Sequence, residues 1–195
     1  MPTDSLGTLS LRDATLADVP LLQALIALSA RELCRADYTQ AQVEAAIGTA
    51  WGVDTQLIRD RTYFVVSASA APDEFLACGG WSKRRTLFGG DQHATREPEL
   101  LDPQLEAARI RAFFVQPQAA RRGIGRTLLA HCEHAAYAAG YRSAELVATL
   151  PGQRLYRAFG YSGETRVTYP LANGLSIDFV PMRKVLAPNT LTRDA

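Results

Sequence analysis

Cysteine is scarce in this sequence and follows no recognisable motif. The 195 residues include three cysteines, Cys34, Cys78 and Cys132, with neither a CxxC pair nor the spacing of metal ligands. Each stands in an apolar context, which favours buried free thiols over a disulfide framework. We therefore expect neither a disulfide scaffold nor a metal centre.

The sequence also lacks a large charge excess and long apolar runs. Its formal net charge is +1, whereas nucleic-acid-binding domains usually carry a clear basic excess. No apolar stretch is long enough for a membrane span, and no signal peptide is visible. These absences predict a cytoplasmic protein that binds neither nucleic acid nor membranes, although a local basic patch remains compatible with them.

The composition that is present belongs to an ordinary globular domain. Apolar residues make up 47% and charged residues 21% of the chain, and a chain of this length can form one domain with a sizeable core. No repeat, low-complexity tract or linker divides it. We expect a single domain over residues 1–186 and a flexible tail over residues 187–195.

The most informative stretch of the sequence runs from Ala108 to Leu129. A β-rich apolar run, closed by Pro117, predicts a buried strand containing Ile110, Phe113, Phe114 and Val115. Apolar residues spaced by three and four predict one face of a following helix, which ends at Gly140 and includes Leu128, Leu129, Cys132, Ala135, Ala136 and Ala139. A loop with two glycines joins the strand directly to this helix.

This loop has the features of an anion site. The first turn of a helix has N–H groups without intrahelical partners, and the helix dipole makes that end positive. Gly123 and Gly125 have no Cβ atom, so a ligand can approach the backbone closely. Arg121, Arg122 and Arg126 add positive charge. The combination predicts a seat for a phosphate or pyrophosphate.

The same residues carry a resemblance to a known family. The segment from Phe114 to Leu129, FVQPQAARRGIGRTLL, resembles the acetyl-CoA-binding motif of the GNAT superfamily of N-acetyltransferases. A second segment, LYRAFGY at residues 155–161, is similar to the family's helix that ends in a tyrosine, a glycine and an aromatic residue. The resemblance is strong from about Arg109 to Tyr161.

The resemblance implies a fold and an activity. It implies an α/β fold with a central mixed β-sheet flanked by helices, in which an early pair of helices walls the acceptor pocket. It further implies acetyl-CoA as cosubstrate and direct transfer of its acetyl group to a primary amine of a small molecule or peptide. The identity of the acceptor and the oligomeric state, a homodimer included, stay open.

The resemblance also implies which residues bind acetyl-CoA. The backbone of Phe113, Phe114 and Val115 would pair with the pantetheine arm. The backbone N–H groups that hold the pyrophosphate would come from the stretch Arg121, Arg122, Gly123, Ile124, Gly125 and Arg126. The chain departs from the family at Ala120, where an arginine or glutamine is usual, and Arg121 or Arg122 can compensate for it.

Tyr156 matches the family tyrosine that often protonates the departing thiolate. A phenol with a pKa of about 10 is a sensible donor to a thiolate of pKa about 8.5 when the site brings the two together. We expect Leu155 and Phe159 to form the core face of this helix and the Tyr156 hydroxyl to point toward the thioester. A tyrosine that only packs the helix against the sheet is the alternative.

The catalytic base is left open by the sequence. Several family members have a glutamate near the start of the central strand, but the matching residue here is Arg109. Glu106, Glu145 and an ordered water relaying to a distant carboxylate are equal alternatives.

Outside the motifs, periodicity predicts the order strand, two helices, three strands, helix, strand, helix, two strands. The second helix follows a capping box at Thr39–Gln42 and continues to Trp51, and a turn lies at Ala71–Asp73. Residues 82–107 are irregular, and we expect them to border the acceptor pocket and to be mobile without ligand. His93 within them is expected to be a solvated loop histidine. A hairpin is predicted at Asn173–Gly174.

The sequence can be compared with three rival functions. A dinucleotide-binding site fits poorly, because the third glycine position of its fingerprint is Leu128, and a P-loop fails because no Gly-Lys-Ser/Thr follows. A non-catalytic acyl-CoA-binding or regulatory module of the same fold is the remaining alternative, because the base is uncertain and a fold does not determine a function.

Overall fold

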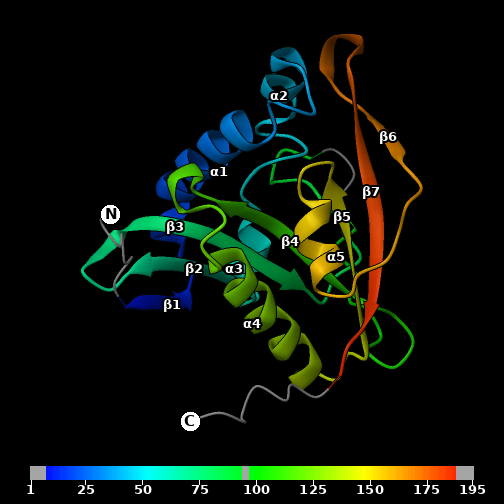
Figure 1. Ribbon diagram of the computed structural model, residues 1–195. Coiled ribbons are helices and arrows are strands. Elements are labelled where there is room, and N and C mark those ends of the chain that lie inside the picture. Colours follow the sequence, from blue (N-terminus) through cyan, green and yellow to red (C-terminus); the bar gives the residue numbers. More distant parts are fainter. Residues whose placement is uncertain (1–7, 94–96, 188–195) are drawn as a thin grey trace.

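The computed structural model describes residues 8–93 and 97–187. Its centre is a seven-stranded sheet in the order β1-β2-β3-β4-β5-β7-β6, so that β1 and β6 lie at the two edges (Figure 1). The strands are β1 (Leu9–Asp13), β2 (Tyr63–Ala68), β3 (Ala71–Ser82), β4 (Ala108–Val115), β5 (Ser143–Thr149), β6 (Val167–Pro170) and β7 (Ser176–Val185). The helices are α1 (Val19–Leu33), α2 (Gln40–Ala46), α3 (Thr55–Arg59), α4 (Ile124–Ala138) and α5 (Gln153–Ala158).

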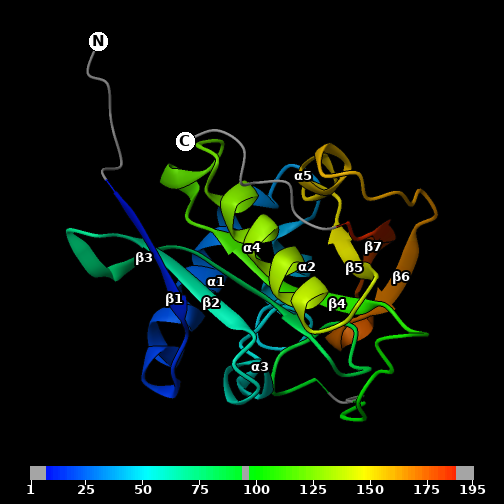
Figure 2. The same cartoon turned by 90° about the horizontal axis from the view of Figure 1, so that it is seen from below.

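The sheet is mixed, as predicted. β4 and β5 run parallel, whereas every other neighbouring pair is antiparallel. The parallel pair is joined by α4, which crosses one face of the sheet as a crossover helix must (Figure 2). The predicted α/β fold class, with a central mixed sheet flanked by helices, is therefore confirmed.

Two hydrophobic cores lie on opposite faces of the sheet. Successive residues of β2 alternate between them: Phe64 and Val66 pack with α4, whereas Tyr63 and Val65 pack with α1. The α4 helix supplies the first core with a fully buried stripe, formed by Ile124, Leu128, Leu129, Cys132 and Ala136. Four residues of the predicted face, Leu128, Leu129, Cys132 and Ala136, belong to this stripe, whereas Ala135 is half-buried and Ala139 is exposed.

Most predicted elements are present, with three differences. The second helix ends at Ala46 rather than Trp51, because Gly48 turns the chain at φ +86° and the Trp51 N–H donates to Ala46 O at 2.9 Å. Trp51 is buried as its periodicity implied, but from a loop. The short helix α3 was not predicted. The turn was expected at Ala71–Asp73, but these residues are the start of β3, because the chain already reverses at residues 69–70.

Other local predictions are confirmed. Thr39 and Gln42 form the capping box reciprocally, through Thr39 Oγ1 and Gln42 Oε1. β6 and β7 pair through a connection in which Asn173 and Gly174 both have positive φ, 59° and 70°. The division at residue 186 stays a prediction, and residues 188–195 of the predicted tail lie outside the described part of the chain.

Candidate active site

The site begins where two parallel strands separate. The ladder between β4 and β5 joins Ala108 with Ala144 and Arg109 with Glu145, and beyond these pairs the strands point apart (Figure 1). The separation follows a β-bulge in β4, because Ala112 and Phe113 together lie opposite Gly79 of β3. Ala112 adopts φ +51° at this point, and its carbonyl accepts a hydrogen bond from the Tyr63 hydroxyl at 3.0 Å.

The bulge depends on two glycines in β3. A Cβ on Gly79 would lie 2.4 Å from the Phe113 ring, and a Cβ on Gly80 would lie 2.3 Å from Thr62 O. No side chain fits at either position, so the ring of Phe113 covers the backbone of β3 directly. The pair Gly79–Gly80 therefore lets β4 bend away from β5.

A cavity of about 210 Å³ lies between the diverging strands. Its walls come from both strands, over residues 110–115 of β4 and Leu146, Val147 and Thr149 of β5. Tyr156, Ile110 and Leu146 line it from the core that includes α4, whereas Cys34, Trp51 and Phe179 line it from the core that includes α1. The cavity is therefore lined from both faces of the sheet, and we call it the passage through the sheet.

The predicted phosphate seat lies at the α4 end of this passage. Gly123 precedes the helix at φ +85°, and the Thr127 N–H donates to Gly123 O at 3.0 Å, so the amides before Thr127 form the open first turn. Ile124 is 1% exposed and offers only its backbone to a ligand. Arg121 and Arg126 are exposed, and Arg126 stacks over the Phe159 ring at 5.6 Å.

The residues at this seat fit an acyl-CoA. A Cβ on Gly123 would meet nothing within 4 Å, so the turn opens to solvent. A Cβ on Gly125 would point toward Val115 and Leu155, 3.5 Å from each, so the Gly125 backbone lies beside two residues that line the cavity. Val115, Phe114 and Phe113 of β4 line the passage itself. A positive helix end, an open glycine turn and a strand beside a cavity are thus continuous.

Tyr156 forms part of the wall of the passage. It lines the cavity and is 8% exposed, and its ring packs edge-on against Phe113 at 6.5 Å and against Tyr161 at 5.8 Å. The prediction that Leu155 and Phe159 form the core face of α5 is wrong, because both are half-buried and Tyr156 is the buried residue. Burial raises the pKa of Tyr156 above that of a free phenol, so the hydroxyl keeps its proton at neutral pH.

The two carboxylates that the sequence suggested as bases lie elsewhere. Glu145 forms an ion pair with Arg109, and Glu106 forms one with Arg85. The Asp102 N–H and Arg85 lower the pKa of Glu106 by bonding its charged form. Among the described residues that line the cavity, none is a carboxylate or a histidine.

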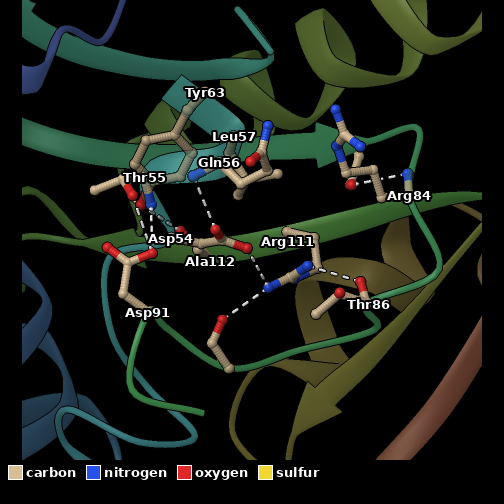
Figure 3. A network of polar contacts seen from close by, with 12 residues as sticks. Asp54, Thr55, Gln56, Leu57, Tyr63, Arg84, Thr86, Asp91, Arg111 and Ala112 are labelled. Atoms are coloured by element: carbon tan, nitrogen blue, oxygen red, sulfur yellow. Dashed lines mark hydrogen bonds and ion pairs between the residues drawn. The ribbon is translucent and has the colours of Figure 1, made fainter. Parts of the chain in front are cut away.

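A buried ion pair holds the wall of the cavity on the α1 side (Figure 3). Arg111 of β4 lies next to the bulge and is 3% exposed. Its Nη2 donates to Asp54 Oδ2 at 3.0 Å and to Gly89 O at 2.7 Å, and its Nη1 donates to Thr86 O at 2.7 Å. One guanidinium therefore joins the central strand to the start of α3 and to residues 86–89. The sequence analysis missed this role, since an arginine in a strand carries no motif.

The irregular segment after β3 borders the cavity through Leu87, Phe88 and Gly89, and its place beside an acceptor stays a prediction. Many contacts tie it down, among them Arg84 with Asp60 at 2.6 Å and the Asp91 N–H with Val53 O at 2.9 Å. Its mobility stays a prediction. The expectation of a solvated His93 is wrong, because that residue is 6% exposed and its Nδ1 lies 3.0 Å from the Tyr169 hydroxyl. Ring contacts with Phe88 and Tyr169 explain its burial.

Tyr38, in the connection between α1 and α2, extends the ladder between β5 and β7. The last backbone pair of that ladder is Thr149 with Phe179. At the next position the Tyr38 hydroxyl accepts from the Leu150 N–H at 2.9 Å and donates to Asp178 O at 2.6 Å. The phenol thus occupies the place of a backbone rung just before the chain turns into α5.

Comparisons with known proteins agree with this geometry. Residues 73–162 match the family model described as the acetyltransferase (GNAT) domain. No curated protein matches the chain in sequence. The part of the chain that matches the family model includes β4, α4, β5 and α5, the elements that surround the passage.

Solved structures share the fold at low identity. The GCN5-related N-acetyltransferase from Rhodopseudomonas palustris is 19% identical over 92% of this chain and 97% of its own, with a TM-score of 0.66. The PaiA N-acetyltransferase from Thermoplasma acidophilum, in complex with coenzyme A, is 13% identical over 91% and 99%, with a TM-score of 0.60. YncA from Salmonella typhimurium, with its cofactor acetyl-CoA, is 15% identical over 97% and 99%, also with a TM-score of 0.60.

Residues 8–93 and 97–187 contain no group of three or more His, Cys, Asp or Glu side chains that could hold a metal ion. None of their helices combines the length and hydropathy that crossing a lipid bilayer requires. The matched family model and the shared fold agree with the resemblance seen in the motifs: residues 73–162 match the GNAT acetyltransferase domain, and the fold is that of solved GNAT structures.

Proposed function

We propose that this protein is an N-acetyltransferase that moves the acetyl group of acetyl-CoA directly to a primary amine. The observation that carries the proposal is the passage between β4 and β5, which is lined from both faces of the sheet, has Tyr156 in its wall and shares Val115 and Leu155 with the surroundings of Gly125 in the first turn of α4. Such a passage lets a thioester and an amine meet from the two sides of the sheet without a covalent enzyme intermediate.

The α4 side is proposed to bind acetyl-CoA, which supplies an activated acetyl thioester. The backbone N–H groups from Arg121 through Arg126 would hold the pyrophosphate, with the helix dipole and the exposed guanidinium groups of Arg121 and Arg126 adding positive potential. The bent end of β4, Phe113 to Val115, would present backbone groups to the pantetheine arm where β5 no longer pairs with it.

Tyr156 is proposed to act as the general acid. As the amine nitrogen bonds to the carbonyl carbon and the carbon–sulfur bond breaks, the Tyr156 hydroxyl gives its proton to the sulfur. The amine proton that is lost passes to solvent, and the tyrosine regains a proton from there, so that an amide and free CoA leave. The raised pKa of Tyr156 keeps the hydroxyl protonated throughout the neutral range, so the proton is present for transfer, and the same shift makes the phenol a weaker acid.

The alternative is a module that binds acyl-CoA without catalysis. It remains in view because no carboxylate or histidine occurs among the described lining residues to take the amine proton. A base in contact is unnecessary if the amine enters the cavity in its neutral form.

The decisive experiment measures both binding and turnover. Isothermal titration with CoA and acetyl-CoA tests the seat, and release of free thiol with a panel of primary amines tests transfer. Binding together with amine-dependent thiol release and an N-acetylated product by mass spectrometry is the expected result. Binding without product from any amine would favour the non-catalytic module, and absence of CoA binding would overturn both.

A further inference from the structure

The acceptor end of the passage has a chemical character of its own. We propose that it takes a primary amine carried on an aromatic or apolar skeleton and rejects amines that carry a second positive charge. This inference rests on the proposed acetyl transfer and adds the class of acceptor to it.

Three aromatic side chains form the apolar wall on the α1 side. Trp51, Phe88 and Phe179 all line the cavity, and they contact one another around Phe179, which lies 6.4 Å from the Trp51 ring and 5.7 Å from the Phe88 ring. The same cavity is also lined by Leu33, Ala50, Gly52 and Leu87. An aromatic or branched apolar group can bury its surface against such a wall, while a chain of polar atoms would lose water there without gaining partners.

The wall is held in place before any ligand arrives. Phe88 packs edge-on against Tyr169 at 4.8 Å, and the next residue, Gly89, is tied through its carbonyl to Arg111 at 2.7 Å. Tyr38 contacts Trp51 edge-on at 5.8 Å and is itself bonded to two backbone groups. Preformed apolar surface of this kind selects by shape and desolvation.

The charges at the cavity oppose a second ammonium group. No described lining residue is a carboxylate, and Arg111 is the basic residue among them. Its guanidinium is already bonded to Asp54 and to two backbone carbonyls, so Asp54 faces a cation that belongs to the protein. A diamine or polyamine would therefore bury its second charge without a counter-ion, which proteins rarely tolerate.

The same apolar wall bears on the missing base. Burial in an apolar site disfavours the charged form of an amine and lowers its pKa. Losing the ammonium proton at neutral pH costs less free energy for an amine of low basicity, such as an α-amino group of pKa about 7.7–8.0, than for a lysine-type amine of pKa about 10.4. The pocket can thus receive the neutral nucleophile with its proton left in water.

A matched pair of probes tests the wild-type protein. Thiol release should be measured with acetyl-CoA and either 2-phenylethylamine or 1,5-diaminopentane, two primary alkyl amines that differ in the aromatic group and the second charge. We expect kcat/KM to favour 2-phenylethylamine by at least about tenfold, as apolar pockets discriminate. Calorimetric titration of each amine in the presence of saturating CoA should show the same preference without turnover.

Phe88→Glu and Phe88→Leu then test the wall itself. Phe88 is half-buried, so a carboxylate at this position can reach solvent. Phe88→Glu should shift the ratio of kcat/KM values toward 1,5-diaminopentane by at least about tenfold, whereas Phe88→Leu should keep the order of preference. Val185, at the end of β7, is 79% exposed, and Val185→Ala is the control that should leave kcat/KM for both amines unchanged.

The outcomes separate this inference from the proposed function. Equal or better acetylation and binding of 1,5-diaminopentane by the wild type would overturn the inference and leave acetyl transfer intact. Acetyl-CoA binding with no binding or acetylation of 2-phenylethylamine would also overturn it. A protein that binds no CoA would contradict the proposed function instead, while amine binding measured without cofactor would still report on the aromatic wall.

Discussion

The two faces of the sheet offer a ligand different groups beside the cavity: backbone amides of the α4 turn on one face and aromatic side chains on the other. At the α4 end, the open helix turn and two glycines offer amides to a ligand, and Ile124 turns its side chain into the core. At the α1 end, Trp51, Phe88 and Phe179 form the surface, and the buried pair of Arg111 with Asp54 holds it.

This difference explains which end a sequence motif can describe. A backbone cradle needs glycines and a helix start at fixed spacing, so it leaves a local pattern in the chain. A side-chain wall is assembled from separate loops, and many combinations of residues can build it. The α4 end should therefore tolerate few local changes, whereas the α1 end should depend on its tertiary contacts.

The largest effect is expected from Arg111→Met. The change leaves the Asp54 carboxylate, whose side chain is 2% exposed, without its guanidinium. Loss of one partner of a buried ion pair typically costs about 3–5 kcal/mol, which urea unfolding can measure. If Arg111→Met remains folded, it should bind CoA as the parent does. It should lose affinity for the acceptor, because the Thr86 and Gly89 carbonyls lose their hydrogen bonds from Arg111.

Two further variants control for this effect. Arg84→Met breaks a pair with Asp60 whose arginine is 24% exposed, and it should cost about 1 kcal/mol or less. Arg111→Met combined with Asp54→Asn removes the buried charge and should recover part of the lost stability. If Arg111→Met proved no more costly than Arg84→Met, the anchoring role assigned to the buried pair would be wrong.

The next largest effect is expected from Tyr156→Phe. The ring contacts with Phe113 and Tyr161 remain, so stability and CoA affinity should change little. Loss of the general acid should slow the single-turnover rate by about 10²-fold, or about 2.7 kcal/mol. Because burial raises the pKa of Tyr156, its deprotonation should not lower the wild-type rate between about pH 7 and pH 9. An unchanged single-turnover rate in the folded variant would leave Tyr156 as a packing residue.

The sequence was sufficient for the α4 half of the molecule. Local periodicity located β4, α4 and β5, and β5 has the predicted bounds, Ser143–Thr149. These elements follow from spacing within one stretch of chain. The reversed core face of α5 shows the limit of this reasoning, since its Tyr156 packs against Phe113 from a distant strand and the helix turns accordingly.

The α1 half could not be predicted in the same way. Trp51 is buried by contacts with Tyr38 and Phe179, and helical spacing could not distinguish this from a longer helix. His93 is buried by Phe88 and by Tyr169, a residue 76 positions away. Such contacts are set by the sheet, which brings the loops together only after the strands have paired. Residues that interact across the chain leave no local pattern.

Gly125→Ala is expected to have a smaller effect at the cradle. A Cβ would make ordinary contacts of 3.5 Å with Val115 and Leu155, and alanine favours the helix, so thermal stability should hold or rise. The methyl group would narrow the mouth where the backbone meets the ligand, and CoA affinity measured by calorimetry should fall about tenfold, or about 1.4 kcal/mol. Thr127→Ala, an exposed change on the same helix, is the matched control. Equal CoA affinity in both variants would place the ligand elsewhere.

The smallest effect is expected from Tyr38→Phe, which tests whether Tyr38 on the α1 side of the cavity is energetically coupled to Tyr156. The hydroxyl occupies a rung between Leu150 N and Asp178 O, and β5 becomes α5 just beyond it. Its removal should cost about 1–1.5 kcal/mol of stability and should speed hydrogen exchange at the Leu150 amide. If the rung positions Tyr156, the single-turnover rate should fall severalfold in the wild-type background and hardly at all in the Tyr156→Phe background, because coupled residues are not additive. Equal effects in both backgrounds, with the same loss of Leu150 protection, would confine Tyr38 to the α1 half and leave the two ends independent.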